Sequence, residues 1–178
     1  MTLRFTKMSG AGNDFIVVDN TGGDLSPLLT GAFIAGICRR KTGVGADGLL
    51  ELLPPARGGV FSMGYYNSDG GRAPMCGNGA RCICRFAAAA GLVEEGVEFL
   101  FTSDSGLHRG LVASGDTARV WMTEPSVAFL EREINFGPVW PVSLVDTGVP
   151  HAVTVRSHIH DGSFERWAEA LRSHPDLG

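Results

Sequence analysis

Glycine is the residue that most constrains what this chain can fold into. The 178 residues include 25 glycines, which are dispersed between short apolar stretches and do not form a linker or a regular repeat. Glycine adopts the backbone conformations that tight turns require, so single glycines between apolar runs are typical of strands joined by many turns. The sequence therefore predicts a β-rich protein.

The composition and charge exclude several classes of protein. Hydrophobic residues make up 44% of the chain, which is enough for a globular core and excludes a disordered protein. The formal net charge of −4 gives no general attraction to nucleic acid or to anionic membranes. No apolar run is long enough to cross a bilayer, and Met1–Lys7 is not followed by the apolar region of a signal peptide. We therefore expect a cytoplasmic protein with reduced cysteines, and neither nucleic acid nor a membrane as a partner.

Three helices are expected between the strands. The best one covers residues 78–90, because it is rich in alanine and is followed by Gly91 as a C-terminal cap. A second helix is expected over residues 27–40, with Ser26 as its cap, and a third over residues 163–173.

Strands account for most of the remaining apolar stretches. The first two strands are expected to form a hairpin around a glycine-rich turn at residues 8–14. A first domain is expected at residues 1–124 and the start of a second, β-rich domain at residues 125–178. The expected strands lie at residues 3–5, 15–19, the end of 43–53, 60–66, 97–102, 110–113, 118–122, 134–145 and 151–155.

Cys76 stands at the start of the best predicted helix, followed by Gly77 and Asn78. A helix start gathers unpaired N–H groups and a partial positive charge, which bind carboxylates and lower the pKa of a nearby thiol. One element can thus hold a substrate carboxylate and present a base to the adjacent carbon. From the residues alone, a small buried cysteine at a helix start is an equally good interpretation.

Removal of the α-proton of an amino acid is the demanding reaction that such a base could perform. No nucleotide-binding loop stands in the right context, so a site of this kind would work without a cofactor. Inversion also needs an acid on the opposite face, which a second thiol could supply, but only one such thiol is evident. Cys82 and Cys84 have the wrong spacing for zinc, face different directions on a helix and are expected to pack; no metal is expected.

Five ordered blocks of sequence resemble the diaminopimelate epimerase family. They extend over nearly the whole chain in the order in which the family has them, which makes chance a poor explanation. The blocks are residues 7–15 (KMSGAGNDF), 43–50 (GVGADGLL), 66–82 (with YNSDG and CGNGARC), 102–106 (TSDSG) and 147–153 (TGVPHAV).

The resemblance implies an α+β fold and a cofactor-independent isomerase. The fold has two similar halves, each a curved, mostly antiparallel sheet wrapped around a central helix, with the second half incomplete here. The family interconverts L,L- and meso-2,6-diaminopimelate, on the route to lysine and peptidoglycan precursors. Its members commonly pair, so the resemblance also implies a homodimer.

The resemblance also implies the roles of individual residues. Cys76 is one of two catalytic thiols, and His151 lies beside the thiols and helps to tune them. The implied substrate-binding residues are Asn13, Asn67, Gly77 and Asn78, of which Gly77 and Asn78 hold the carboxylate at the reacting centre.

This sequence departs from the family in three places. Val149 replaces an asparagine, and Gly48 stands where some members have a glutamine, so two substrate contacts are changed. The family also continues for roughly another hundred residues, where it has its second cysteine. We therefore expect the chain to be a fragment that cannot complete epimerisation alone.

Two alternatives remain. One is a related isomerase of the same fold that acts on another amino acid such as proline. The other is a non-catalytic module that binds amino acids with half of a site.

Overall fold

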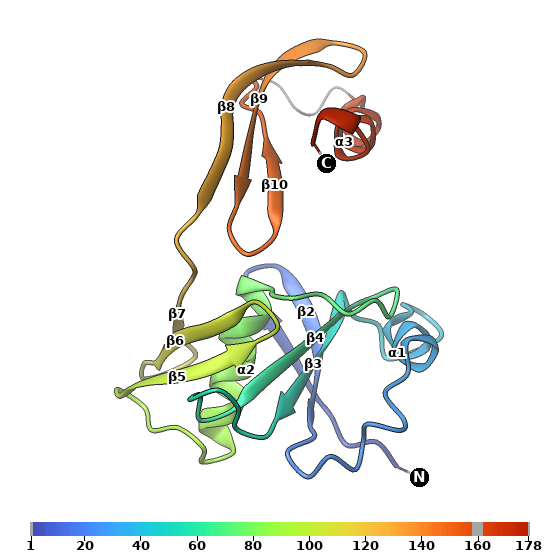
Figure 1. Cartoon of the computed structure of the whole chain (residues 1–178). Coiled ribbons are helices and arrows are strands. Elements are labelled where there is room, and N and C mark those ends of the chain that lie inside the picture. The colour runs from blue at the N-terminus through green and yellow to red at the C-terminus, as the bar shows by residue number, and fades with distance from the viewer. Residues whose placement is uncertain (1, 158–161, 178) are drawn as a thin grey trace. The chain divides into compact units, whose positions relative to one another are not determined.

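The computed structural model of the chain describes residues 2–157 and 162–177 (Figure 1). The chain divides into two compact units, Met1–Met122 and Thr123–Gly178, and each is described by itself. Among the described residues, no helix has the length and apolar character needed to span a membrane.

The first unit is a seven-stranded sheet that curves around a central helix, α2 (Gly77–Ala89) (Figure 1). The strands are arranged in chain order, and all neighbours pair antiparallel except β2–β3 and β4–β5. Helix α2 packs on both edge strands, β1 and β7, as well as on strands between them. The strands are β1 (Thr6–Gly10), β2 (Asn13–Asp19), β3 (Gly48–Leu53), β4 (Ser62–Asn67), β5 (Glu98–Ser103), β6 (Gly106–Val112) and β7 (Ala118–Trp121). The predicted curved, mostly antiparallel sheet around a helix is confirmed.

Strand β2 shows why its sequence is apolar without alternation. Phe15 and Val17 point into the core around α2, whereas Ile16 and Val18 pack with α1 (Gly31–Cys38) on the other face. A strand that is buried on both faces has a continuous apolar run.

The α2 helix forms where the sequence predicts it, within one residue at each end. Cys76 is its N-cap, and Gly91, with a positive φ of 75°, follows the C-cap. The amides of Gly91 and Leu92 donate to the last turn, which closes the helix as glycine allows.

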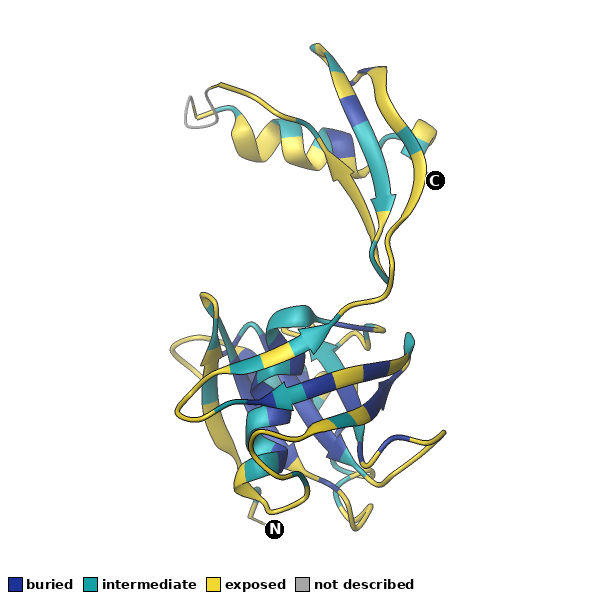
Figure 2. Cartoon of the chain, turned by 90° about the vertical axis from the view of Figure 1, so that its left-hand side faces the viewer, coloured by how far each residue is buried: buried dark blue, intermediate teal, exposed yellow. Residues whose placement is uncertain are grey.

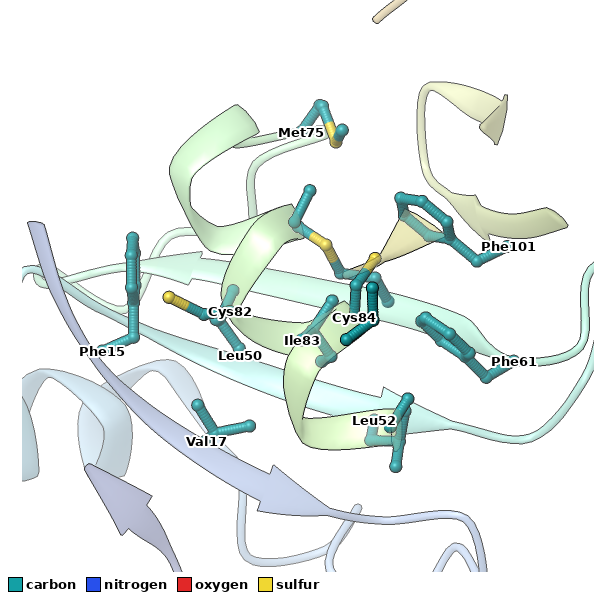
Figure 3. Close-up of a cluster of buried hydrophobic side chains, with 14 residues drawn as sticks. Phe15, Val17, Leu50, Leu52, Phe61, Met75, Cys82, Ile83, Cys84 and Phe101 are labelled. Carbon is teal, nitrogen blue, oxygen red and sulfur yellow. The ribbon is translucent and has the colours of Figure 1, made fainter. Parts of the chain in front are cut away.

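The buried face of α2 forms the centre of the core. Ile83 is fully buried, and the Cys82 sulfur points toward Phe15 while the Cys84 sulfur points toward Phe101 (Figure 3). The prediction that these two cysteines are packing residues facing different directions is confirmed.

A histidine that the sequence did not single out is also buried in the first unit. The His108 side chain lies 5.2 Å from the Phe101 ring, and its Nε2 is 2.8 Å from Ser103 Oγ. Its Nδ1 has no hydrogen-bond partner within the described chain. Burial lowers the pKa of His108.

Two predicted boundaries near the amino terminus are wrong. The hairpin turn is only Ala11–Gly12, both with positive φ, so β1 covers residues predicted as turn and not residues 3–5. Helix α1 begins after Thr30, whose side chain accepts from the Phe33 amide, whereas the Ser26 hydroxyl accepts from Asn20 and caps no helix.

The second unit has a three-stranded antiparallel sheet in the order β10-β9-β8. The strand predicted at 134–145 is in fact the end of β8 and most of β9, which are separated by a turn. Helix α3 confirms the predicted third helix to within one residue at each end. Few residues of this unit are buried (Figure 2), and its small core contains Ile134, Phe136, Val142 and Leu171. The elements are β8 (Ser126–Asn135), β9 (Val139–Asp146), β10 (Pro150–Val153), α3 (Phe164–Arg172) and a 3₁₀ turn (Pro175–Leu177).

Candidate active site

Cys76 occupies the N-cap of α2 and is only partly buried. Its backbone is extended (φ −143°, ψ 114°), and its sulfur accepts a hydrogen bond from the Gly79 amide at 3.4 Å. The amides of Gly77 and Asn78 donate to no protein acceptor in the described part of the chain. The helix start therefore offers two free donors and a partial positive charge next to the thiol.

Two glycines let the start of α2 approach the sheet closely. A Cβ atom on Gly10 of β1 would lie 2.8 Å from Cys82 Sγ and 2.9 Å from the Asn78 carbonyl oxygen. A Cβ atom on Gly79 would lie 2.8 Å from Leu50 Cδ2. Because neither glycine has a side chain, the helix start lies directly against β1 and β3.

Asn13 and Asn78 meet at this helix start. The Asn78 Nδ2 group donates to Asn13 Oδ1 at 2.8 Å, although the two residues are 65 positions apart. Asn13 Nδ2 donates in turn to Asp47 Oδ2 at 3.1 Å, and Arg81 donates to Asn78 Oδ1. The structure thus brings together Asn13, Asn78 and, through the helix start, Cys76.

A cluster of charges surrounds the β1–β2 hairpin next to Asn13. Arg40 binds Asp14 through two nitrogens and also donates to Asp47 Oδ1 at 2.7 Å. Lys7 lies 2.6 Å from Asp14 Oδ2. Arg40 first, and then Lys7, hold the pKa of the Asp14 carboxyl well below its usual range. Sequence reasoning did not find this cluster.

Tyr65 is hydrogen-bonded to Asn67 and packs against the same core cluster as Cys76. Residues 65 and 67 of β4 point to the same face of the sheet, and the Tyr65 hydroxyl donates to Asn67 Oδ1 at 2.8 Å. Burial first, and then the neighbouring Cys76 thiol, raise the pKa of Tyr65 to about 12. Tyr65 was missed in the sequence, where only its position two residues before Asn67 could have indicated it.

Gly48 has a structural reason to be glycine. It pairs with Asn67 between β3 and β4, and a Cβ atom there would lie only 2.4 Å from the Tyr66 carbonyl oxygen. A larger residue at this position would require the two strands to separate.

His151 lies in β10 of the second unit, whereas the other five predicted site residues lie in the first. Its Nδ1 is 2.6 Å from the Val149 carbonyl oxygen, which can only accept, so Nδ1 carries a proton and donates. The two units are described separately, so His151 is placed only within its own unit.

A cavity of about 580 Å³ lies beside His151 in the second unit. Its lining includes Trp140, Phe164 and Trp167 and adjoins the small core of this unit. Sequence patterns did not indicate this cavity. Within residues 2–157 and 162–177, no group of three or more His, Cys, Asp or Glu side chains is placed to hold a metal ion.

The fold is shared with solved structures of other proteins. The structure is similar to that of a probable proline racemase from Agrobacterium radiobacter K84, with a TM-score of 0.72 and 16% identity, over 99% of this chain and 63% of that chain. It is also similar to a hydroxyproline epimerase from Agrobacterium vitis, with a TM-score of 0.71 and 16% identity, over 98% of this chain and 62% of that chain. At 16% identity, these two likenesses show the fold alone.

Similarity in sequence is more specific than similarity in fold. The family described as diaminopimelate epimerase matches residues 5–127. The chain is 40% identical to the diaminopimelate epimerase of Chlorobaculum tepidum, over 82% of this chain and 54% of that protein. It is 34% identical to the one from Desulforudis audaxviator, over 97% of this chain and 67% of that protein. The chain belongs to the diaminopimelate epimerase family, and it spans between about half and two thirds of the length of these two relatives.

Proposed function

We propose that this chain carries one of the two catalytic thiols, Cys76, of an enzyme that interconverts L,L- and meso-2,6-diaminopimelate without a cofactor. This reaction would supply lysine and peptidoglycan precursor synthesis. The observation that supports the proposal is the Cys76 thiol at the α2 N-cap, beside two free amides and the Asn13–Asn78 pair. The names of the relatives supply the substrate.

The proposed reaction removes the α-proton from one face of the α-carbon and adds a proton to the opposite face. The substrate α-carboxylate accepts hydrogen bonds from the amides of Gly77 and Asn78. The Cys76 thiolate takes the α-proton, and the electron pair of the C–H bond is delocalised into the carboxylate, which the helix start stabilises. A thiol on the opposite face then gives its proton to carbon and becomes a thiolate.

The remaining predicted residues have supporting roles in this proposal. Asn13 and Asn67 hold polar groups of the substrate, and His151 helps to tune the thiols. The second thiol would come from the part of the relatives' length that this chain does not span. An antibody to this chain, used on a blot of cells of the source organism, should detect a polypeptide with about one and a half times the mass of this chain.

Proton NMR of L,L-diaminopimelate in heavy water tests the role of Cys76. We expect the 178-residue chain to exchange the α-proton for deuterium slowly, with retention and without forming the meso isomer. Exchange should stop in Cys76→Ala. Full conversion to the meso isomer by the isolated chain would contradict the two-thiol mechanism, and exchange that survives Cys76→Ala would remove Cys76 from it.

The two alternatives make different predictions in the same assay. A proline-racemase-like enzyme would exchange the α-proton of proline faster than that of diaminopimelate, although neighbours at 16% identity support only the fold. A non-catalytic module would bind diaminopimelate and shift its resonances without any exchange.

A further inference from the structure

A chain of hydrogen bonds crosses the candidate site between two opposite charges. It begins at the Arg81 guanidinium on α2, which donates to Asn78 Oδ1. Asn78 Nδ2 donates to Asn13 Oδ1 at 2.8 Å, and Asn13 Nδ2 donates to Asp47 Oδ2 at 3.1 Å. We call these four residues the amide relay.

The charges at its ends fix the orientation of both amides. A guanidinium can only donate and an ionised carboxylate can only accept. If the Asn78 amide were flipped, its NH₂ group would face Arg81; if the Asn13 amide were flipped, its carbonyl would face Asp47. Either flip leaves part-buried polar groups without partners, which is unfavourable. Each amide is therefore held in one of its two orientations.

The relay leaves donors free. Each Nδ2 group has two hydrogens, and one of each is used within the relay. The second hydrogen of Asn13 and that of Asn78 have no protein acceptor in the described part of the chain, and neither do the backbone amides of Gly77 and Asn78. Four N–H donors thus remain at one helix start, which suits a carboxylate.

Asp47 is well placed to anchor the relay. Its Oδ2 also accepts from the Asp14 amide at 3.1 Å, and its Oδ1 accepts from Arg40 at 2.7 Å. Its own amide donates to the Asp14 carbonyl at 2.9 Å, next to the parallel β2–β3 pair. The carboxylate is therefore held by the sheet, independently of α2.

We propose that Asp47 and Arg81 are positioning residues that hold the side-chain amides of Asn13 and Asn78 with their free N–H donors available to a substrate carboxylate. The nature of the ligand rests on the proposed function. The orientation of the amides does not, so the two can be tested separately.

The first test uses the 178-residue chain without ligand. In ¹⁵N–¹H spectra, we compare how fast side-chain amide protons exchange with water. The Asn13 and Asn78 Nδ2 protons that are hydrogen-bonded within the relay should exchange at least about tenfold more slowly than those of a solvent-exposed asparagine. A hydrogen bond that contributes about 1.4 kcal/mol gives this ratio. Asp47→Ala removes the acceptor of the Asn13 Nδ2 proton and should abolish its protection, and the double variant Asp47→Ala/Arg81→Met should abolish the protection of Asn78 as well. The matched controls, Asp104→Ala and Arg85→Met, remove surface ion pairs elsewhere in the unit and should change neither. Protection that survives both relay substitutions would overturn the proposal.

The second test adds L,L-diaminopimelate to the same variants. Asp47→Ala should weaken binding about tenfold, because it loosens Asn13, and should have no further effect in the Asn13→Ala background. An equal loss of affinity in that background would show that Asp47 acts on the fold and not through Asn13, which would overturn its role. If the wild-type chain shows the relay but its resonances do not respond to diaminopimelate, the proposed substrate fails while the positioning of the amides stands.

Discussion

Replacement of Cys76 by serine should separate its structural role from its chemical one. The Cys76 sulfur is a weak acceptor and lies 3.4 Å from the Gly79 amide that it caps. A serine hydroxyl is a stronger acceptor, and serine is among the best N-cap residues. Serine at this position should therefore stabilise the first unit by about 1 kcal/mol relative to alanine, with cysteine between them.

The assay for this prediction is urea unfolding, followed through α2 resonances of the first unit. With a slope of about 2 kcal/mol per molar urea, 1 kcal/mol moves the midpoint by about 0.5 M. The order of midpoints should be serine, cysteine, alanine. In contrast, α-proton exchange should be lost in both variants, because a serine hydroxyl does not ionise near neutral pH. Exchange retained by Cys76→Ser, or a serine variant less stable than the alanine variant, would refute this reasoning.

Three further predictions concern the first unit. Gly10→Ala should destabilise it by about 2 kcal/mol in urea unfolding, because its Cβ would lie 2.9 Å from the Asn78 carbonyl oxygen. Gly36→Ala in α1, where nothing lies within 4 Å, should instead stabilise it by up to about 1 kcal/mol; equal effects would contradict the close approach. Ile83→Ala should cost about 3 kcal/mol in the same assay, since Ile83 is fully buried, and a loss below about 1 kcal/mol would argue against this core. The folded-state pKa of His108 is lowered, so the unfolded chain binds more protons and stability should fall as the pH drops below about 6.5. Urea midpoints at pH 8 and pH 5 should differ less in His108→Asn, and an unchanged difference would exclude this histidine as the cause.

Local patterns predicted the elements that depend on neighbouring residues. The α2 helix could be predicted because its cap, its alanines and Gly91 lie within sixteen residues of each other. The hairpin at Asn13 was predicted, but its turn was placed over residues 8–14 because Gly10 and Gly12 were both interpreted as turn residues. Of these two glycines, only Gly12 has a positive φ, whereas Gly10 is needed for the close approach of helix α2.

Contacts between distant residues could not be predicted in the same way. The contact of Asp47 with Asn13 depends on the parallel register of β2 and β3, in which Phe15 pairs with Gly48. Nothing in a single sequence gives that register. Strand β8 was missed over most of its length because nearly all of its residues are exposed or half-buried, so it lacks the alternation that indicates a strand.

The order of the strands in the first sheet has a consequence for synthesis. Since each strand lies beside the one made before it, most pairings can form as the chain leaves the ribosome. Helices separate two neighbouring pairs in the chain, α1 between β2 and β3 and α2 between β4 and β5, but only the β4–β5 ladder is reduced to a single pair, Ser62–Thr102. We expect β1–β4 and β5–β7 to form as two early ladders, and their joining across α2 to be the late, rate-limiting step of folding.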